Sequence, residues 1–137
     1  MNGRYTLTAT NAAIDRVQLS LCMFLYEVCN DVQFEHMSGS DFVNFLNLKP
    51  TAAPVIVRPR ENLRICYLAY VISKTIAPKS EAERWTKGFL GTCHIAHEYY
   101  RKHCRDIASK YATSANKEFA GMIETALQRH HRYNTMR

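Results

Sequence analysis

The chain has 137 residues, of which 47% are hydrophobic and 22% are charged. This length suits one compact domain, and the composition is too apolar for a disordered chain. The five glycines and four prolines exclude collagen-like and low-complexity proteins. The formal net charge of +6 makes a polyanion a reasonable expected partner.

The positive charge is unevenly distributed along the chain. Residues 1–57 contain three basic and five acidic side chains, whereas residues 58–137 contain 15 basic and seven acidic ones. The whole positive excess therefore lies in the second part of the chain. A surface that binds a polyanion is expected there.

The sequence also bears on the cellular compartment. The first residues contain no apolar run of the length that a signal peptide needs, and the most apolar stretch, 19–26, is shorter than a bilayer span. The five cysteines cannot all pair within the chain, and four of them lie in apolar helical contexts. We therefore expect a cytoplasmic protein with reduced thiols and no membrane association.

Apolar residues recur at helical spacing over residues 14–32 and predict a first helix that is buried on much of its circumference. Thr10 or Asn11 is its expected cap, and Ser40 is expected to cap a second helix over 41–48. Residues 49–60 contain three prolines and predict a non-helical insert. It is either a loop pinned by its own apolar side chains or a short extended piece at Val55–Val57.

A third helix is expected to follow Pro59 and to run to about Ile76. Ser80 and Glu83 have the spacing of a capping box, which predicts a long fourth helix to about Tyr111. Ser114 is the expected cap of a last helix, and the basic tail from Arg129 is expected to fray.

The predicted fold is all-α. It is a single compact bundle of about five helices, with the proline-containing insert between the second and third helices. Residues 1–137 form one domain, with residues 1–10 and 131–137 as flexible ends.

Cys93 and His97 would lie one turn apart on the fourth helix, a spacing that suits a metal ion. A zinc site would need two more ligands, and the other Cys and His residues have no matching spacing. A core-facing stripe of Cys and His explains the same residues, so we predict no metal and no cofactor. His94 and Glu98 could act as a general base and its orienting group, but no catalytic motif accompanies them, so we predict a solvent-exposed pair and no enzyme.

The segment 106–119 resembles a helix-turn-helix. Its second helix would place Asn116 and Lys117 against base edges in the major groove of DNA. Ala108 would be the crossing residue of this motif, with Phe119 and Ile123 as anchors. Nothing breaks the helix before Asp106, so the first helix would be much longer than in this motif. An ordinary helical hairpin with a capped turn explains the same residues.

The first functional hypothesis is a small non-enzymatic protein that binds nucleic acid, specifically DNA, and regulates transcription. Basic side chains on the last two helices would supply the phosphate contacts. The predicted nucleic-acid contacts are Arg101, Lys102, Arg105, Lys110, Ser114, Asn116, Lys117, Arg129 and Arg132.

The alternative hypothesis is a protein-interaction module, a small inhibitor or adaptor, or a homodimer. Its contacts would come from apolar side chains on the outer side of the fourth helix and in the proline-containing insert. These are Ile95, Tyr99, Val55 and Val57. Burial against the insert is the other explanation for Ile95 and Tyr99.

Overall fold

The computed structural model describes residues 16–135 of the chain, and within this range all regular structure is helical. The all-α prediction is confirmed, with six α-helices and one short 3-10 helix in place of about five helices. The predicted caps Thr10 and Asn11 lie outside the described residues. In chain order the elements are α2 (Leu19–Cys29), α3 (Gly39–Leu46), α4 (Asn62–Ser73), α5 (Lys79–Thr92), α6 (His97–His103), η1 (Asp106–Ala108) and α7 (Ser114–Thr135).

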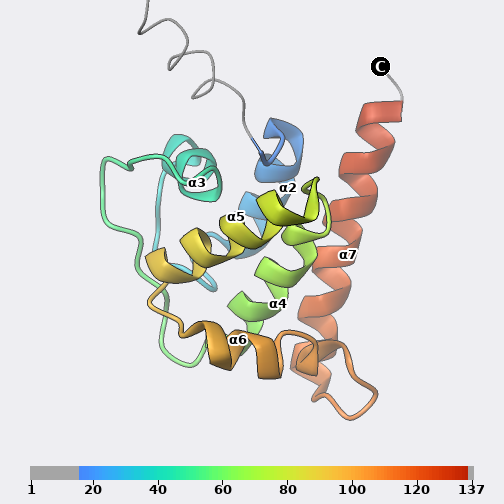
Figure 1. The fold of residues 1–137 in the computed structure, drawn as a ribbon. Helices are drawn as coiled ribbons and strands as arrows, with labels where there is room; N and C mark the ends of the chain where they lie inside the picture. Colours follow the sequence, from blue (N-terminus) through green and yellow to red (C-terminus); the bar gives the residue numbers. More distant parts are fainter. Residues whose placement is uncertain (1–15, 136–137) are drawn as a thin grey trace, which may run out of the picture.

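Two helices organise the bundle. α2 packs against α3 and α7, while α4 packs against α5, α6, η1 and α7. Figure 1 shows α7 along one side of the molecule and α4 between α5 above and α6 below. Five fully or almost fully buried aromatic side chains fill the core between α3 and α5. These are Phe34, Phe42, Phe45, Trp85 and Phe89.

The ends of α3 are closed by side chains. Ser38 is the N-cap, because its hydroxyl accepts a hydrogen bond from the Asp41 amide at 3.1 Å, so the predicted cap Ser40 is wrong. At the other end, Asn47 binds the Val43 carbonyl, and the buried Trp85 indole donates to the Leu46 carbonyl at 2.7 Å. Helix ends leave such carbonyls without partners inside the helix, so these bonds stabilise α3 and join it to α5.

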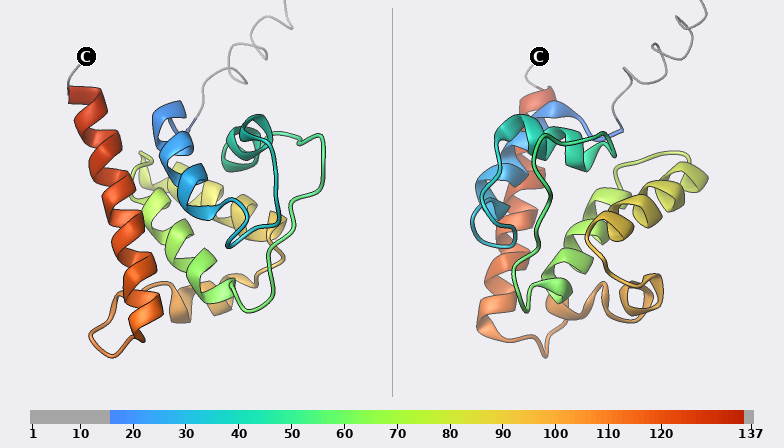
Figure 2. Two further views of the ribbon diagram at one scale, coloured as in Figure 1. Left: turned by 180° about the vertical axis from the view of Figure 1, so that it is seen from behind. Right: turned by 90° about the vertical axis from the view of Figure 1, so that its left-hand side faces the viewer.

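The predicted non-helical insert is confirmed. The buried Asp41 carboxylate accepts hydrogen bonds from the amides of Ala52 and Ala53. Further along, Val57 forms an isolated antiparallel bridge with Phe34. The insert therefore lies extended along the α3 side of the bundle, as Figure 2 shows, and it is held by backbone bonds in addition to its apolar side chains.

The predicted long fourth helix is wrong. α5 ends at Thr92, His94 adopts a left-handed backbone with φ of 58°, and a new helix, α6, begins at His97. α6 ends at His103, and only the three-residue η1 follows before the turn to α7. The predicted capping box is also absent, because α5 begins at Lys79, before Ser80, and no side chain caps it.

The start and end of α7 also differ from the prediction. The Thr113 hydroxyl accepts a hydrogen bond from the Asn116 amide at 3.2 Å, so Thr113 takes the capping role expected of Ser114. The helix continues to Thr135, so residues 129–135 are helical rather than frayed. None of the helices in the described range is long and apolar enough to cross a membrane.

Candidate functional site

A groove with a volume of about 840 Å³ lies where the end of α4, one face of α5 and one face of α6 meet. Its charged lining consists of four Lys and Arg side chains, one histidine and a single carboxylate, that of Glu83. We call this feature the basic groove and define it by Lys74, Lys79, Lys87, His97 and Arg101. The size lies in the range of ligand-binding clefts.

The packing of α5 fixes the orientation of the basic groove. Lys79, Glu83 and Lys87 follow one another at four-residue steps and therefore share one helix face. The opposite face of α5 carries Trp85 and Phe89, whose stacked rings lie 4.9 Å apart in the core. Burial of this aromatic face directs the lysines into the groove.

The cations of the basic groove lack acidic partners. Among the described residues, no carboxylate lies within ion-pair distance of Lys79, Lys87 or Arg101, and Lys74 sits 4.9 Å above the Tyr70 ring. By contrast, four arginines outside the groove pair with glutamates at 2.6–3.1 Å: Arg16 and Arg84, which share Glu81, and Arg64 and Arg129. Uncompensated charge in a concave site concentrates the positive potential there.

Tyr100 holds α6 against α4 at the floor of the basic groove. Its side chain is buried, and it lines the groove beside Ser73. Burial raises the pKa of Tyr100 to about 12, and the neighbouring Ser73 hydroxyl only partly offsets this effect. The phenol therefore stays neutral at physiological pH and adds no negative charge to the groove.

The structure brings only part of the predicted nucleic-acid set together. Arg101 lines the basic groove, and together with Lys102 it also lines a neighbouring hollow on the outer side of α6. The other predicted side chains that remain exposed to solvent are Arg105, Lys110, Ser114, Lys117, Arg129 and Arg132. Sequence reasoning missed Lys74, Lys79 and Lys87, and it considered His97 only as a possible metal ligand. The four-residue spacing of Lys79 and Lys87 on α5 was the one available signal.

Two of the predicted contacts already have partners within the protein. The Asn116 Oδ1 accepts a hydrogen bond from Arg64 at 2.9 Å, which ties α7 to α4. Arg129 pairs with Glu27 at 3.1 Å and lies 4.4 Å above the Phe24 ring, which ties α7 to α2. Both side chains therefore serve helix packing in this structure.

The segment predicted to resemble a helix-turn-helix has an irregular first half. Ala108 lies in η1, a three-residue 3-10 helix, where the motif would have a full α-helix. The expected anchors Phe119 and Ile123 are buried on α7. Contact between Lys117 and DNA stays a prediction.

The predicted protein-interaction residues do not form one exposed surface. Ile95 is buried, with 7% exposure, because the break before α6 turns it into the core, so its predicted exposure is wrong. Tyr99 is 37% exposed, while Val55 and Val57 pack half-buried against the core. Prominent exposed apolar side chains lie instead on α2, whose predicted burial on most sides is wrong at Leu19 and Met23.

The Cys93 and His97 pair does not have the predicted geometry. Cys93 is buried at the end of α5, whereas His97 is exposed and opens α6. Burial raises the pKa of the Cys93 thiol, and it raises that of Cys66 to about 12. Within residues 16–135, no three His, Cys, Asp or Glu side chains are grouped so as to hold a metal ion.

The predicted i, i+4 pair of His94 and Glu98 is also absent, because the two residues do not belong to one helix. His94 lies in the bend between the two helices, and Glu98 lies in the first turn of α6. The two residues therefore do not share one helix face. The spacing that suggested a general base and its orienting group depended on a continuous helix, which is absent here.

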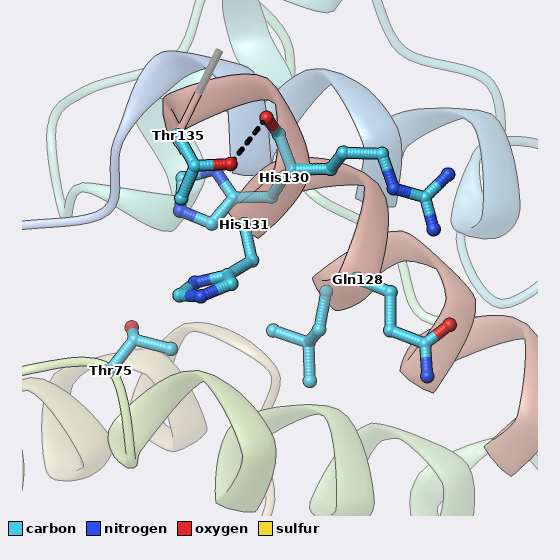
Figure 3. A pocket seen from close by; sticks show the side chains of 7 residues that line it. Thr75, Gln128, His130, His131 and Thr135 are labelled. Atoms are coloured by element: carbon cyan, nitrogen blue, oxygen red, sulfur yellow. Dashed lines mark hydrogen bonds between the residues drawn. The ribbon is translucent and has the colours of Figure 1, made fainter. Parts of the chain in front are cut away.

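A second hollow, of about 680 Å³, lies between Thr75 and the last turns of α7. Figure 3 shows the ring of His131 facing Thr75 across this hollow. The His130 ring is occupied by contacts with Ser20 at 2.7 Å and Asn134 at 3.3 Å. Arg132 is the one permanent cation in the lining, so this hollow attracts anions less strongly than the basic groove does.

Comparison with protein-family models, with curated proteins and with solved structures finds no significant match to this chain. Function must therefore be inferred from the geometry and charge of the described residues.

Proposed function

We propose that this protein is a non-enzymatic nucleic-acid-binding protein whose basic groove holds backbone phosphates. The observation that carries the proposal is that the four permanent cations of the groove have no carboxylate partner in the described residues. Phosphate contacts require this kind of positive surface, and they position a nucleic acid without reading its sequence.

The surroundings of the groove support the same function. Lys102 and Arg105 follow Arg101 at the end of α6, and both are exposed, so positive side chains continue beyond the groove. A regulatory role, as in the control of transcription, and a cytoplasmic location belong to this proposal. The five free thiols fit a reducing compartment.

Binding at the groove differs from the helix-turn-helix mode, in which the start of α7 would read base edges. The two modes depend on different lysines. Lys79 and Lys87 belong to the groove alone, and Lys117 belongs to the start of α7. This separation allows a direct test.

The test measures fluorescence anisotropy of labelled oligonucleotides at two salt concentrations. The groove variant carries Lys79→Glu with Lys87→Glu, and the matched control carries Lys117→Glu with Arg132→Glu. Each pair changes the net charge by the same amount on exposed side chains, and circular dichroism verifies that both variants fold.

The proposal expects at least a tenfold loss of affinity in the groove variant and less than a threefold loss in the control. Equal losses in both variants would indicate a general charge effect and contradict it. A larger loss in the control would favour α7 as the binding element. Absence of binding by the unaltered protein at low salt would refute nucleic-acid binding altogether.

A further inference from the structure

Tyr99 on α6 is an exposed aromatic side chain beside the basic groove. It lines the hollow on the outer side of α6 together with two cations, a histidine and one carboxylate: Arg101, Lys102, His103 and Glu98. Arg101 also lines the basic groove, so the two depressions adjoin across this one side chain. A phosphate bound in the groove at Arg101 would therefore lie at the border of the hollow that Tyr99 lines.

Three tyrosines line the basic groove or the adjoining hollow, and among them the ring of Tyr99 remains available to a ligand. The Tyr70 ring is covered by Lys74, and Tyr100 is buried beneath α6. The Tyr99 ring packs against the His103 ring, with 4.7 Å between centroids, and 37% of the residue stays exposed. This packing holds the ring in place while its open part can receive a flat group.

We infer that the nucleic acid bound by the basic groove is single-stranded and that one of its bases stacks on Tyr99; this inference rests on the proposed function. A positive groove for the backbone, flanked by an aromatic side chain, is the arrangement by which proteins hold unpaired nucleic acid. Duplex DNA hides the faces of its bases and is read by an element that protrudes into one of its grooves. Here the cations line a depression of the protein instead.

A second aromatic and cationic pair lies in the loop between η1 and α7. Tyr111 is 85% exposed, and the Lys110 ammonium lies 5.2 Å from the centre of its ring. Figure 1 shows this loop at the same end of the molecule as α6. Lys110 covers one face of this ring, and a nucleic-acid chain that leaves the Tyr99 hollow toward this loop would meet the exposed part of Tyr111 there.

The experiment compares a labelled single-stranded DNA with the same sequence in a blunt duplex, by anisotropy at one fixed salt concentration. The variants are Tyr99→Ala, Tyr99→Phe and the groove variant Lys79→Glu with Lys87→Glu. The matched control is Tyr133→Ala, which removes an exposed tyrosine near the far end of α7.

The inference predicts that the single strand binds at least ten times more tightly than the duplex. Stacking on one aromatic ring has a free energy that corresponds to about 5-fold to 160-fold in affinity, so Tyr99→Ala should lose that factor. Tyr99→Phe and Tyr133→Ala should stay within about twofold of the unaltered protein, because Phe retains the stacking face.

Two results would overturn the inference while leaving the proposed function intact. One is duplex binding as tight as single-strand binding, with the groove variant still defective. The other is an unchanged affinity of Tyr99→Ala for the single strand. If neither nucleic acid binds, the proposed function itself fails, and the inference fails with it.

Discussion

Asn47 should be one of the polar residues on which the fold depends most strongly. It follows α3 and is only 4% exposed. Its Oδ1 accepts a hydrogen bond from the Val17 amide at 2.8 Å, and its Nδ2 donates to the Val17 carbonyl at 3.1 Å. One side chain therefore satisfies both backbone groups of the residue that leads into α2.

The cost of Asn47→Ala follows from these bonds. The substitution leaves the buried amide of Val17 without a partner and leaves its carbonyl with only the weak thiol donor of Cys22 at 3.6 Å. Each buried polar group that loses its partner costs about 1–3 kcal/mol. We expect a loss of about 2–5 kcal/mol in the free energy of unfolding, a large part of the stability of a small domain.

Urea denaturation followed by far-ultraviolet circular dichroism measures this loss. The matched control is Asn44→Ala on α3, because the Asn44 side chain makes no hydrogen bond in the described part of the chain and Ala favours a helix. The control should stay within about 0.7 kcal/mol of the unaltered protein. The reasoning is refuted if Asn47→Ala is as stable as the unaltered protein, or if both variants lose the same free energy.

Three further predictions concern α7 and the thiols. Gly121→Ala should raise the free energy of unfolding by about 0.5–1 kcal/mol, because an added Cβ meets nothing within 4 Å and Ala favours the helix; a lower melting temperature would contradict this. The pKa of His130 is lowered mainly by burial and to a smaller extent by the neighbouring His131. As the pH falls below 6.5, His130 is therefore protonated in the unfolded chain before it is protonated in the folded protein. The free energy of unfolding should therefore fall from pH 7 toward pH 5, less steeply in His130→Gln, and equal slopes would be evidence against it. With a disulfide reagent at pH 8, the half-buried Cys104 should be the one thiol that reacts appreciably in the native protein, and rapid reaction of several thiols would disagree with their burial.

The helices were predictable wherever the local apolar pattern decided the structure. The repeating apolar residues of α4 lie at three- and four-residue steps, and Pro59 and Pro78 bracket that helix in the sequence. The insert was predictable for the same reason, since its prolines exclude a helix whatever surrounds them. In both cases the information lies within about a dozen neighbouring residues.

The break between α5 and α6 could not be predicted in this way. No Gly or Pro stands between Thr92 and the end of α6, and the apolar spacing continues through the bend. Tertiary contacts decide instead. Burial of Ile95 and of Tyr100 stabilises a path that puts His94 in a left-handed backbone conformation.

The basic groove lay beyond sequence reasoning for a related reason. The groove residues lie in the second part of the chain, where the charge asymmetry placed the expected polyanion-binding surface, and Arg101 was among the predicted contacts. Lys74, Lys79 and Arg101 belong to three different helical segments, however, and they meet only because α5 and α6 both pack on α4. A helical wheel compares positions within one helix, so it cannot predict that residues of different helices lie close together.

Salt dependence of binding tests most directly whether the basic groove holds nucleic-acid phosphates. Four permanent cations line the groove, and each phosphate contact on a single strand contributes about −0.7 to the slope of log K against log salt. We predict a slope of about −3 for the unaltered protein and about −1.5 for the variant with Lys79→Glu and Lys87→Glu. A slope near zero for the unaltered protein, or equal slopes for the two proteins, would contradict the assignment of the groove as the phosphate-binding site.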